Sequence, residues 1–402
     1  MKILVAHNTY LQRGGEDTVV EAEVALLRSR GHTVTLYGRD NRDLSRMGRA
    51  GAALDTLWSR RTYTETKHIF DNDKPDVVHV HNTFPLISPS LYWSAARAKV
   101  PVVQTLHNFR LLCPQAMLLR DGKVCELCIG KAPLPGVVHG CYRGSRAQTA
   151  VLGGMLMVHR AMGTWAHKVT RYIALNDFCR AKFIEGGLPA SRISVKPNFV
   201  DFEAPAPSAR TGFLFVGRLS AEKGVGVLAR AASSVAGMNL LVAGTGPEHN
   251  LLEGMPGIQM LGILPGLEVR KRMRSAAALV LPSICYENFP LTLVEAFACG
   301  LPVIASRTGA MAALIQDSVT GLLFEVANHE DLATKMQWAL ANPEQMLQMG
   351  RNARVHYEAN FTAQRNYTQL IAIYESALTD DAHEAMQVNT PTHGGAAHGK
   401  NK

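Results

Sequence analysis

Short apolar runs, rich in β-branched residues, alternate along the chain with longer stretches of helical length. Continuously apolar runs predict strands buried on both faces, as in parallel sheets covered by helices. The runs form two series. The first comprises residues 2–8, 32–38, 76–82, 100–108, 171–175 and 193–198, and the second comprises residues 212–219, 239–246, 258–264, 278–283 and 302–306. Two doubly wound α/β domains are therefore predicted.

The boundary between the two series is marked by residues 201–211, which contain Pro205 and Pro207 and predict a linker. After Pro343 the pattern is helical to about Asp381. The predicted units are an N-terminal domain at 1–200 with a Cys-rich insertion at 110–145, a C-terminal domain at 201–362, a helix at 363–382 that returns to the N-terminal domain, and a polar, Gly-rich disordered tail at 383–402. Because open α/β sheets bind ligands at the carboxyl ends of their strands, the cleft between the domains is the expected site.

The composition adds a charge asymmetry to this picture. The 402 residues carry a net charge of +9, and 47% of them are hydrophobic. Residues 1–200 hold 27 Lys and Arg against 15 Asp and Glu (+12), whereas the remainder holds 15 against 18 (−3). The basic half indicates either contact with an anionic partner, such as nucleic acid or a membrane surface, or simply a soluble basic face. No apolar stretch reaches the roughly 18 residues of a membrane span, and no signal peptide is visible, so a cytoplasmic protein is expected.

Two loops that follow predicted strands suit a phosphate group. Gly14 and Gly15 come just before a helix, whose free amides attract anions. Arg218 follows a strand and Lys223 precedes a helix, and two cations at a strand end suit a diphosphate. Ordinary surface charges and a plain Gly-Gly turn are the alternatives. Gly217, Gly244 and Gly262 lie in strand-to-loop turns at the same predicted edge and are expected to line a nucleotide.

The stretch CYENFPLTLVEAFAC (285–299) places two carboxylates in apolar surroundings. A buried carboxylate is costly unless it is paired or hydrogen-bonded. Asn288 is expected to cap a helix whose first turn contains Pro290, so Glu287 lies on a loop and Glu295 within the helix. Carboxylates accept hydrogen bonds from hydroxyls, which suits a sugar at one and a ribose at the other. An acid/base pair is the competing interpretation.

Glu287-x7-Glu295, Arg218 with Lys223, the GGE loop and LPVIAS-x-TG together resemble the retaining glycosyltransferases of family 4, which have the GT-B fold of two Rossmann-like domains. The resemblance covers about residues 1–380. It implies that Arg218 and Lys223 bind the donor diphosphate, Glu287 the donor sugar and Glu295 the ribose, and that Gly15 approaches the phosphate. It also places Asn288, Phe289 and Leu291 beside the donor. The chain departs from the family at Ala310 and Ala313, where relatives often have Gly and Glu.

Three histidines are candidates for the site. The resemblance places His107, at the end of a predicted strand, near the anomeric carbon of the donor sugar. His79 and His81 share one face of another strand. His81 is nearer the strand end and is a candidate for the acceptor side, weaker than His107 is for the donor side. For each of the three, a hydrogen-bonded structural role is the alternative.

Four of the seven cysteines cluster as C-x11-C-x2-C-x12-C: Cys113, Cys125, Cys128 and Cys141. In a reducing compartment this spacing favours structural Zn²⁺ over disulfides, and a coincidental cluster is the alternative. Residues 145–171 are apolar with four basic side chains, so they form either a membrane-surface helix or, more commonly, a helix packed on the N-terminal domain.

The resemblance thus implies a metal-independent retaining transferase. It would move a sugar from a nucleotide-sugar donor to a glycan or lipid-diphosphate-linked acceptor in bacterial polysaccharide assembly, with peripheral contact to the anionic inner face of the membrane. By resemblance, the reaction is a front-face displacement in which the leaving diphosphate helps to deprotonate the acceptor. An epimerase or phosphorylase of the same fold, or a non-catalytic nucleotide or nucleic-acid binder, are the alternatives. Nucleic acid is not expected, because no basic groove with interleaved aromatic residues is apparent. An NAD-dependent oxidoreductase is not expected either, because this chain has no convincing G-x-G-x-x-G turn after a strand.

Overall fold

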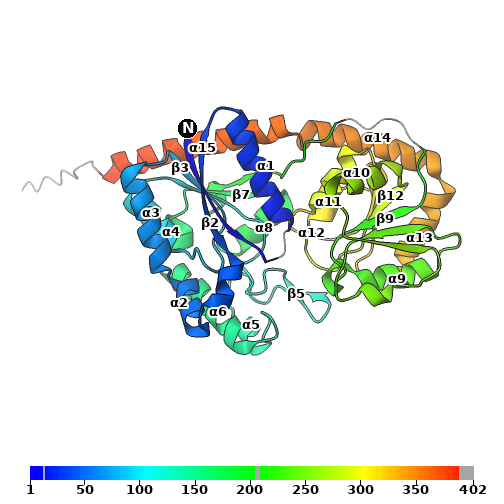
Figure 1. Ribbon diagram of the computed structural model, residues 1–402, viewed down its shortest axis with the longest axis horizontal. Helices are drawn as coiled ribbons and strands as arrows, with labels where there is room; N and C mark the ends of the chain where they lie inside the picture. Colours follow the sequence, from blue (N-terminus) through cyan, green and yellow to red (C-terminus); the bar gives the residue numbers. More distant parts are fainter. Residues whose placement is uncertain (12–13, 204–208, 389–402) are drawn as a thin grey trace, which may run out of the picture.

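The computed structural model describes residues 1–11, 14–203 and 209–388. Within them, two six-stranded parallel sheets form the centres of two α/β domains (Figure 1). The first sheet has the order β2 (Thr33–Asp40), β1 (Lys2–Thr9), β3 (Val77–Asn82), β4 (Val102–Thr105), β7 (Arg171–Ala174) and β8 (Ile193–Val195). The second has the order β11 (Ile258–Gly262), β10 (Leu240–Ala243), β9 (Phe213–Val216), β12 (Ala278–Leu281), β13 (Val303–Ser306) and β14 (Gly321–Phe324).

Helices cover both faces of each sheet, as the continuously apolar strands require. Those of the N-terminal domain are α1 (Gly15–Ser29), α2 (Arg49–Leu57), α3 (Arg60–Asn72), α4 (Ser90–Arg97), α5 (Leu134–Val138), α6 (Arg146–Ala161), α7 (Thr164–His167) and α8 (Asp177–Glu185). Those that follow are α9 (Val225–Ser233), α10 (Gly266–Ser275), α11 (Leu291–Ala298), α12 (Gly309–Leu314), α13 (His329–Ala341), α14 (Pro343–Asn360) and α15 (Ala363–Val388). Short 3₁₀ turns are η1 (Asn41–Arg46), η2 (Ala190–Arg192), η3 (Ala221–Lys223) and η4 (His249–Leu251). The insertion contributes an antiparallel hairpin, β5 (Leu119–Arg120) with β6 (Lys123–Val124).

The sequence pattern missed some boundaries. It did not predict β14. The helical stretch expected from Pro343 to about Asp381 is two helices, α14 and α15, and α15 begins at Ala363, where the helix at 363–382 was expected. α15 extends to Val388, beyond the expected end at 382, and residues 389–402 of the expected tail lie outside the described residues. Residues 204–208 of the expected linker also lie outside them. No helix in the described ranges combines the length and apolarity needed to cross a bilayer.

The last helix, α15, runs back from the C-terminal domain and lies against the first sheet (Figure 1). Leu370, Ile373, Tyr374 and Ala377 join residues of β1, β4, β7 and α1 in one buried apolar cluster. The crossing itself is held by hydrogen bonds from Asn366 Nδ2 to Pro197 O at 2.9 Å and from Tyr357 Oη to Val200 O at 2.8 Å. The chain therefore crosses between the domains twice at one place.

Leu370 is fully buried, so Leu370→Ala is expected to lower the free energy of unfolding by about 2–5 kcal/mol, through lost burial and a residual cavity. Leu347 on α14 is 42% exposed, and Leu347→Ala should change it by less than about 0.5 kcal/mol. Urea denaturation followed by tryptophan fluorescence measures both. Equal effects of the two substitutions would show that α15 does not complete the N-terminal core.

Candidate functional site

The loop after β9 carries Arg218 and then Lys223, and it brings Lys223 to the carboxyl end of β12. After η3, Gly224 adopts φ +71°, and a Cβ there would lie 1.8 Å from the carbonyl oxygen of Pro282. Only glycine permits this approach. Because β9 and β12 are neighbours, and the strand order reverses between them, the loop lies at the switch point where α/β sheets bind ligands.

Lys223 meets the first of the two predicted carboxylates at this point. Lys223 Nζ donates to Glu287 Oε1 at 2.6 Å, and Ser283 Oγ donates to the same oxygen at 2.7 Å. Burial acts to raise the pKa of Glu287, but the charge and hydrogen bond of Lys223 and the hydrogen bond of Ser283 hold it below the ordinary value. Burial acts to lower the pKa of Lys223, and Glu287 more than offsets this and raises it. Both groups are therefore charged at neutral pH.

Glycines bring the neighbouring strand ends together. Gly244 has φ +144°, and a Cβ on it would lie 1.8 Å from Gly217 O. Gly217 N donates to Ala243 O at 3.0 Å, and Gly244 N donates to Gly262 O at 2.7 Å. The three glycines that the sequence singled out thus join the loops after β9, β10 and β11 into one surface beside Lys223.

Arg218 and Glu295 belong to the same edge but do not touch Lys223 or Glu287. Arg218 is exposed, and its guanidinium forms no hydrogen bond or ion pair with any residue that the structure describes; only its backbone carbonyl is bonded, accepting from Ser220 N at 3.1 Å. Glu295 is half-buried on α11, where burial raises its pKa and Arg270 acts against that rise. The arrangement leaves one free guanidinium and one carboxyl for a ligand.

The residues between the two glutamates serve the domain interface. The expectation that Asn288 caps a helix is wrong: α11 begins after Pro290, and no side chain caps it. Instead Asn288 Nδ2 donates to Leu106 O at 3.2 Å, and Asn176 Nδ2 donates to Asn288 O at 2.6 Å. The loop after β12 is therefore bound to the loop after β4 of the other domain. Tertiary contacts outweigh the capping tendency of asparagine here.

Phe289 and Leu291, which the resemblance places beside the donor, have side chains that pack into the C-terminal domain. Both border its apolar core, and the Phe289 ring meets the Phe361 ring at a centroid distance of 6.1 Å. Ala310, one of the two departures from the family pattern, is buried, and its amide donates to Glu287 O at 3.3 Å. Ala313, the other departure, is exposed.

On the N-terminal side, the half-buried His107 pairs with the buried His81. His107 Nε2 and His81 Nδ1 are hydrogen-bonded at 2.8 Å, and the rings stack at 5.1 Å. Burial lowers both pKa values well below the ordinary value, and the neighbouring histidines add to this, so both rings are neutral. Because His81 occupies Nε2, Nδ1 is the nitrogen of His107 left for a ligand hydroxyl.

His79 has a structural role, because its ring nitrogens bond within the core. Nε2 lies 2.8 Å from Thr105 Oγ1, and Nδ1 lies 2.7 Å from Tyr374 Oη and 3.3 Å from Glu23 Oε1. Glu23, His79 and His81 offer three grouped ligand atoms that could hold a metal. However, the Lys196 ammonium lies 3.0 Å from Glu23 Oε2 and already supplies the positive charge. The group is better described as a buried ion pair with hydrogen-bonded histidines.

Sequence reasoning missed Glu16, next to Gly15 in the first turn of α1. Tyr10 Oη donates to Glu16 Oε2 at 2.9 Å, and His7 Nδ1 lies 3.7 Å from Glu16 Oε1. Burial, reinforced by Asp17, raises the pKa of Glu16 to about 8 despite opposing effects of Tyr10 and Arg110. A carboxyl that stays neutral at the amino end of a helix does not repel an anion there. The only signal in the sequence for a role of Glu16 was its position directly after Gly14 and Gly15.

Gly15 begins α1, and a Cβ on it would meet no described atom within 4 Å. Packing against the described residues therefore does not require a glycine at this position. Residues 12–13 of the same loop lie outside the described residues.

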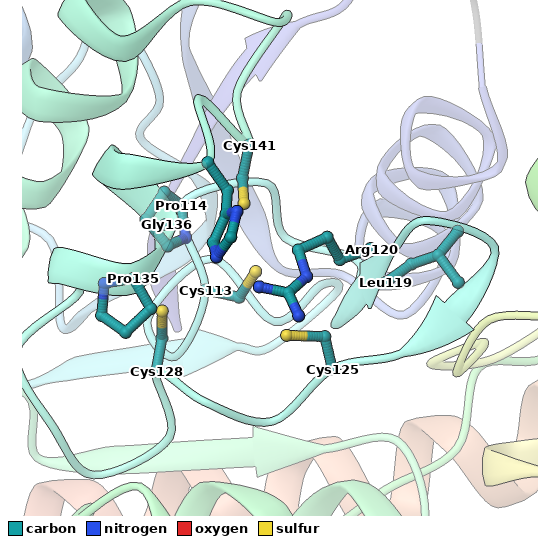
Figure 2. A pocket seen from close by; sticks show the side chains of 10 residues that line it. Cys113, Pro114, Leu119, Arg120, Cys125, Cys128, Pro135, Gly136 and Cys141 are labelled. Carbon is teal, nitrogen blue, oxygen red and sulfur yellow. The ribbon is translucent and has the colours of Figure 1, made fainter.

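The four clustered cysteines lie together. Cys113, Cys125, Cys128 and Cys141 line a single small cavity with Arg120 and His139 (Figure 2). All four thiols are free. The cavity belongs to the insertion and not to the switch point of either sheet.

Comparison with known proteins places this geometry in a family. Residues 13–204 match the model of Glycosyltransferase Family 4, and residues 199–356 match that of Glycosyl transferases group 1. The chain belongs to glycosyltransferase family 4. It has the GT-B fold: HepE from Anabaena, solved in complex with UDP and glucose, superposes with a TM-score of 0.70 at 16% identity, over 94% of this chain and 100% of that one.

Among curated family members, similarity is moderate. The D-inositol 3-phosphate glycosyltransferase of Segniliparus rotundus is 32% identical over 43% of this chain and 41% of its own length. That of Nocardiopsis dassonvillei is 29% identical over 77% of this chain and 72% of its own length. This chain therefore spans less than half the length of the first of these relatives.

The raised pKa of Glu16 predicts that the stability of the folded protein depends on pH. In the unfolded chain its carboxyl ionises near its ordinary pKa of 4.5, whereas the folded protein holds the proton until about 8. Stability should therefore fall between about pH 5 and pH 8, where only the unfolded state releases the proton. Glu16→Gln removes this titration, so its melting temperature relative to wild type should rise across that range.

Differential scanning calorimetry from pH 5 to pH 9 measures this difference. Glu375→Gln, at an exposed side chain on α15 with no ion pair to a described residue, is the control and should show a flat difference. A flat difference for Glu16→Gln as well would mean that Glu16 is already ionised at neutral pH in the folded protein.

Proposed function

We propose that the protein is a retaining glycosyltransferase, which transfers a sugar from a nucleotide-sugar to a hydroxyl of a glycan or lipid-linked acceptor. The observation that carries this proposal is the Lys223–Glu287 pair at the switch point of the second sheet. It presents an ammonium and a carboxylate side by side, which suits a diphosphate and a sugar hydroxyl respectively. The complexes of HepE with UDP and with UDP-glucose support a nucleotide-sugar donor.

In this proposal each residue has a defined task. Lys223 and Arg218 bind the diphosphate and stabilise the charge that develops as it leaves, so these two cations supply the charge without a divalent metal. Glu287 orients the sugar, and Glu295 accepts hydrogen bonds from the ribose. His107 Nδ1 contacts the sugar from the N-terminal side. The acceptor hydroxyl attacks on the face that the diphosphate leaves, and its proton passes to the diphosphate.

The acceptor we propose is a lipid-diphosphate-linked sugar at the inner face of the membrane, in bacterial polysaccharide assembly. Helices α2, α5 and α6 lie together at the end of the N-terminal domain remote from α15 (Figure 1). Exposed apolar side chains occur on these helices, with exposed basic residues in and beside them. They are Leu54, Leu134, Val138 and Val158, with Lys131, Arg143, Arg146 and Arg160. Such a surface suits an anionic bilayer.

The alternatives within the fold are an epimerase and a phosphorylase, and the non-catalytic alternative is a nucleotide or nucleic-acid binder. The mass of the product separates an epimerase from a transferase, because epimerisation conserves the mass of the donor. A binder would retain DNA in a salt-dependent manner and would release no nucleotide from any donor.

The experiment that tests the donor site is nucleotide release from a panel of nucleotide-sugars, repeated with variants. Lys223→Ala should lower turnover on the preferred donor by roughly 100-fold, because charge stabilisation of the leaving group is lost. Glu295→Ala should mainly raise the KM for the donor. Lys271→Ala removes a surface ion pair with Glu268 at 2.6 Å and should have no effect. Unchanged turnover in Lys223→Ala would refute the diphosphate role.

The acceptor is tested by presenting the same sugar in two forms, as a lipid diphosphate in anionic vesicles and as a neutral free sugar. Transfer to the lipid diphosphate is expected to be faster, and to slow as salt is added, because the basic domain is attracted to an anionic surface. Equal turnover on the two forms would refute a lipid-linked acceptor.

A further inference from the structure

The insertion between β4 and α6 has little secondary structure to hold it. It contains a hairpin with two residues in each strand and the five-residue α5. Among the described residues, eight that are not glycine have positive φ, and four of these lie here: Ala116, Leu118, Asp121 and Arg143. Each such residue is strained and persists only where its surroundings hold it. An additional constraint on this segment is therefore expected.

The four cysteines come from separate parts of the insertion and meet at one point (Figure 2). Cys113 lies on the loop after β4, Cys125 and Cys128 on the turn after β6, and Cys141 beyond α5. Cys113 and Cys128 are buried and the other two half-buried, and no disulfide joins them. A cross-link at this point would hold together every part of the insertion.

We propose that these four thiolates bind one structural Zn²⁺ ion. Four sulfur ligands are the donor set that tetrahedral zinc prefers, and they leave no position open for catalysis. Zn–S bonds of about 2.3 Å require sulfur atoms about 3.8 Å apart. No three of these sulfur atoms lie within 4.8 Å of one another among the described residues, so the ion would draw the side chains inwards.

Arg120 lines the same cavity, and its guanidinium would have to move aside to admit the ion. Figure 2 shows its guanidinium between the sulfur atoms of Cys113 and Cys125. A Zn²⁺ ion with four thiolates carries a net charge of −2, and a cation beside it offsets part of that charge.

The metal would also act on the donor loop, through the turn that carries two of its ligands. Glu126, between Cys125 and Cys128, forms an ion pair with Lys182, with 2.6 Å between Glu126 Oε1 and Lys182 Nζ. That nitrogen lies 6.0 Å from the centre of the Tyr286 ring, and Tyr286 packs against Phe178 at 4.8 Å. Because Tyr286 directly precedes Glu287, the zinc-bound turn supports the loop on which the donor carboxylate lies. This second role rests on the proposed function of Glu287.

The metal itself is tested without any activity measurement. The full chain, purified without chelator, should contain about one zinc per chain by mass spectrometry of the element, and replacing zinc with Co²⁺ should give the absorption bands of a tetrahedral tetrathiolate site. Cys125→Ser with Cys128→Ser should lose the metal, and Cys299→Ala, a buried cysteine of the other domain, should retain it.

Two outcomes would overturn the proposal. One is a chain that holds no zinc and takes up no Co²⁺ while its four thiols titrate freely. The other is an intact mass that shows disulfides within the insertion. Because the Co²⁺ spectrum is recorded on the wild-type protein, misfolding of the double variant does not affect the conclusion.

The link to the donor loop is tested with Glu126→Gln, which removes the ion pair and keeps the four ligands. Zinc content should stay at one, the KM for the donor should rise roughly two- to fivefold, and kcat should not change, as expected for the loss of one partly exposed ion pair. Glu126→Asp should restore part of the loss. If KM is unchanged while zinc is retained, the metal only stabilises the insertion, and the donor role of Glu287 is unaffected.

Discussion

The ion pair between Lys223 and Glu287 is the interaction on which the candidate site depends. It joins the loop after β9 to the loop after β12, across the point where the order of the strands reverses. Each charge keeps the other ionised in a half-buried position, where either alone would be costly. The site is therefore preorganised: its cation and carboxylate are held in place before a ligand arrives, and Gly224 is the residue that permits the close approach.

The domain interface continues from this pair. The residue after Glu287, Asn288, is bonded to Leu106 and Asn176 of the N-terminal domain. Leu106 directly precedes His107, so the carboxyl ends of the two sheets meet through adjacent residues. The crossing of α15 holds the domains together at a second place, far along the chain from the first. A change in the relative position of the domains would therefore change the distance between His107 on one side of the site and Glu287 on the other.

The two sides differ in their electrostatics. In the C-terminal domain the prominent groups are charged, and Arg218 is exposed. In the N-terminal domain burial keeps His81, His107 and Glu16 neutral at pH 7. A neutral imidazole and a protonated carboxyl can both exchange hydrogen bonds with hydroxyl groups without repelling a nearby anion. This division suits a ligand with an anionic end and a polyhydroxyl end.

The sequence by itself determined the two-domain α/β architecture, because continuously apolar runs at helical intervals have few other solutions. It also determined which residue types gather at the strand ends, since strand ends are marked by Gly217, Gly244 and the cations. It could not show that Asn288 binds the other domain instead of capping α11, or that Glu16 keeps its proton. Both depend on atoms that are distant along the chain, and pKa values and buried hydrogen bonds are decided by three-dimensional surroundings. The grouping of the four cysteines was suggested by their spacing, but only the tertiary structure brought them, with Arg120, around one cavity.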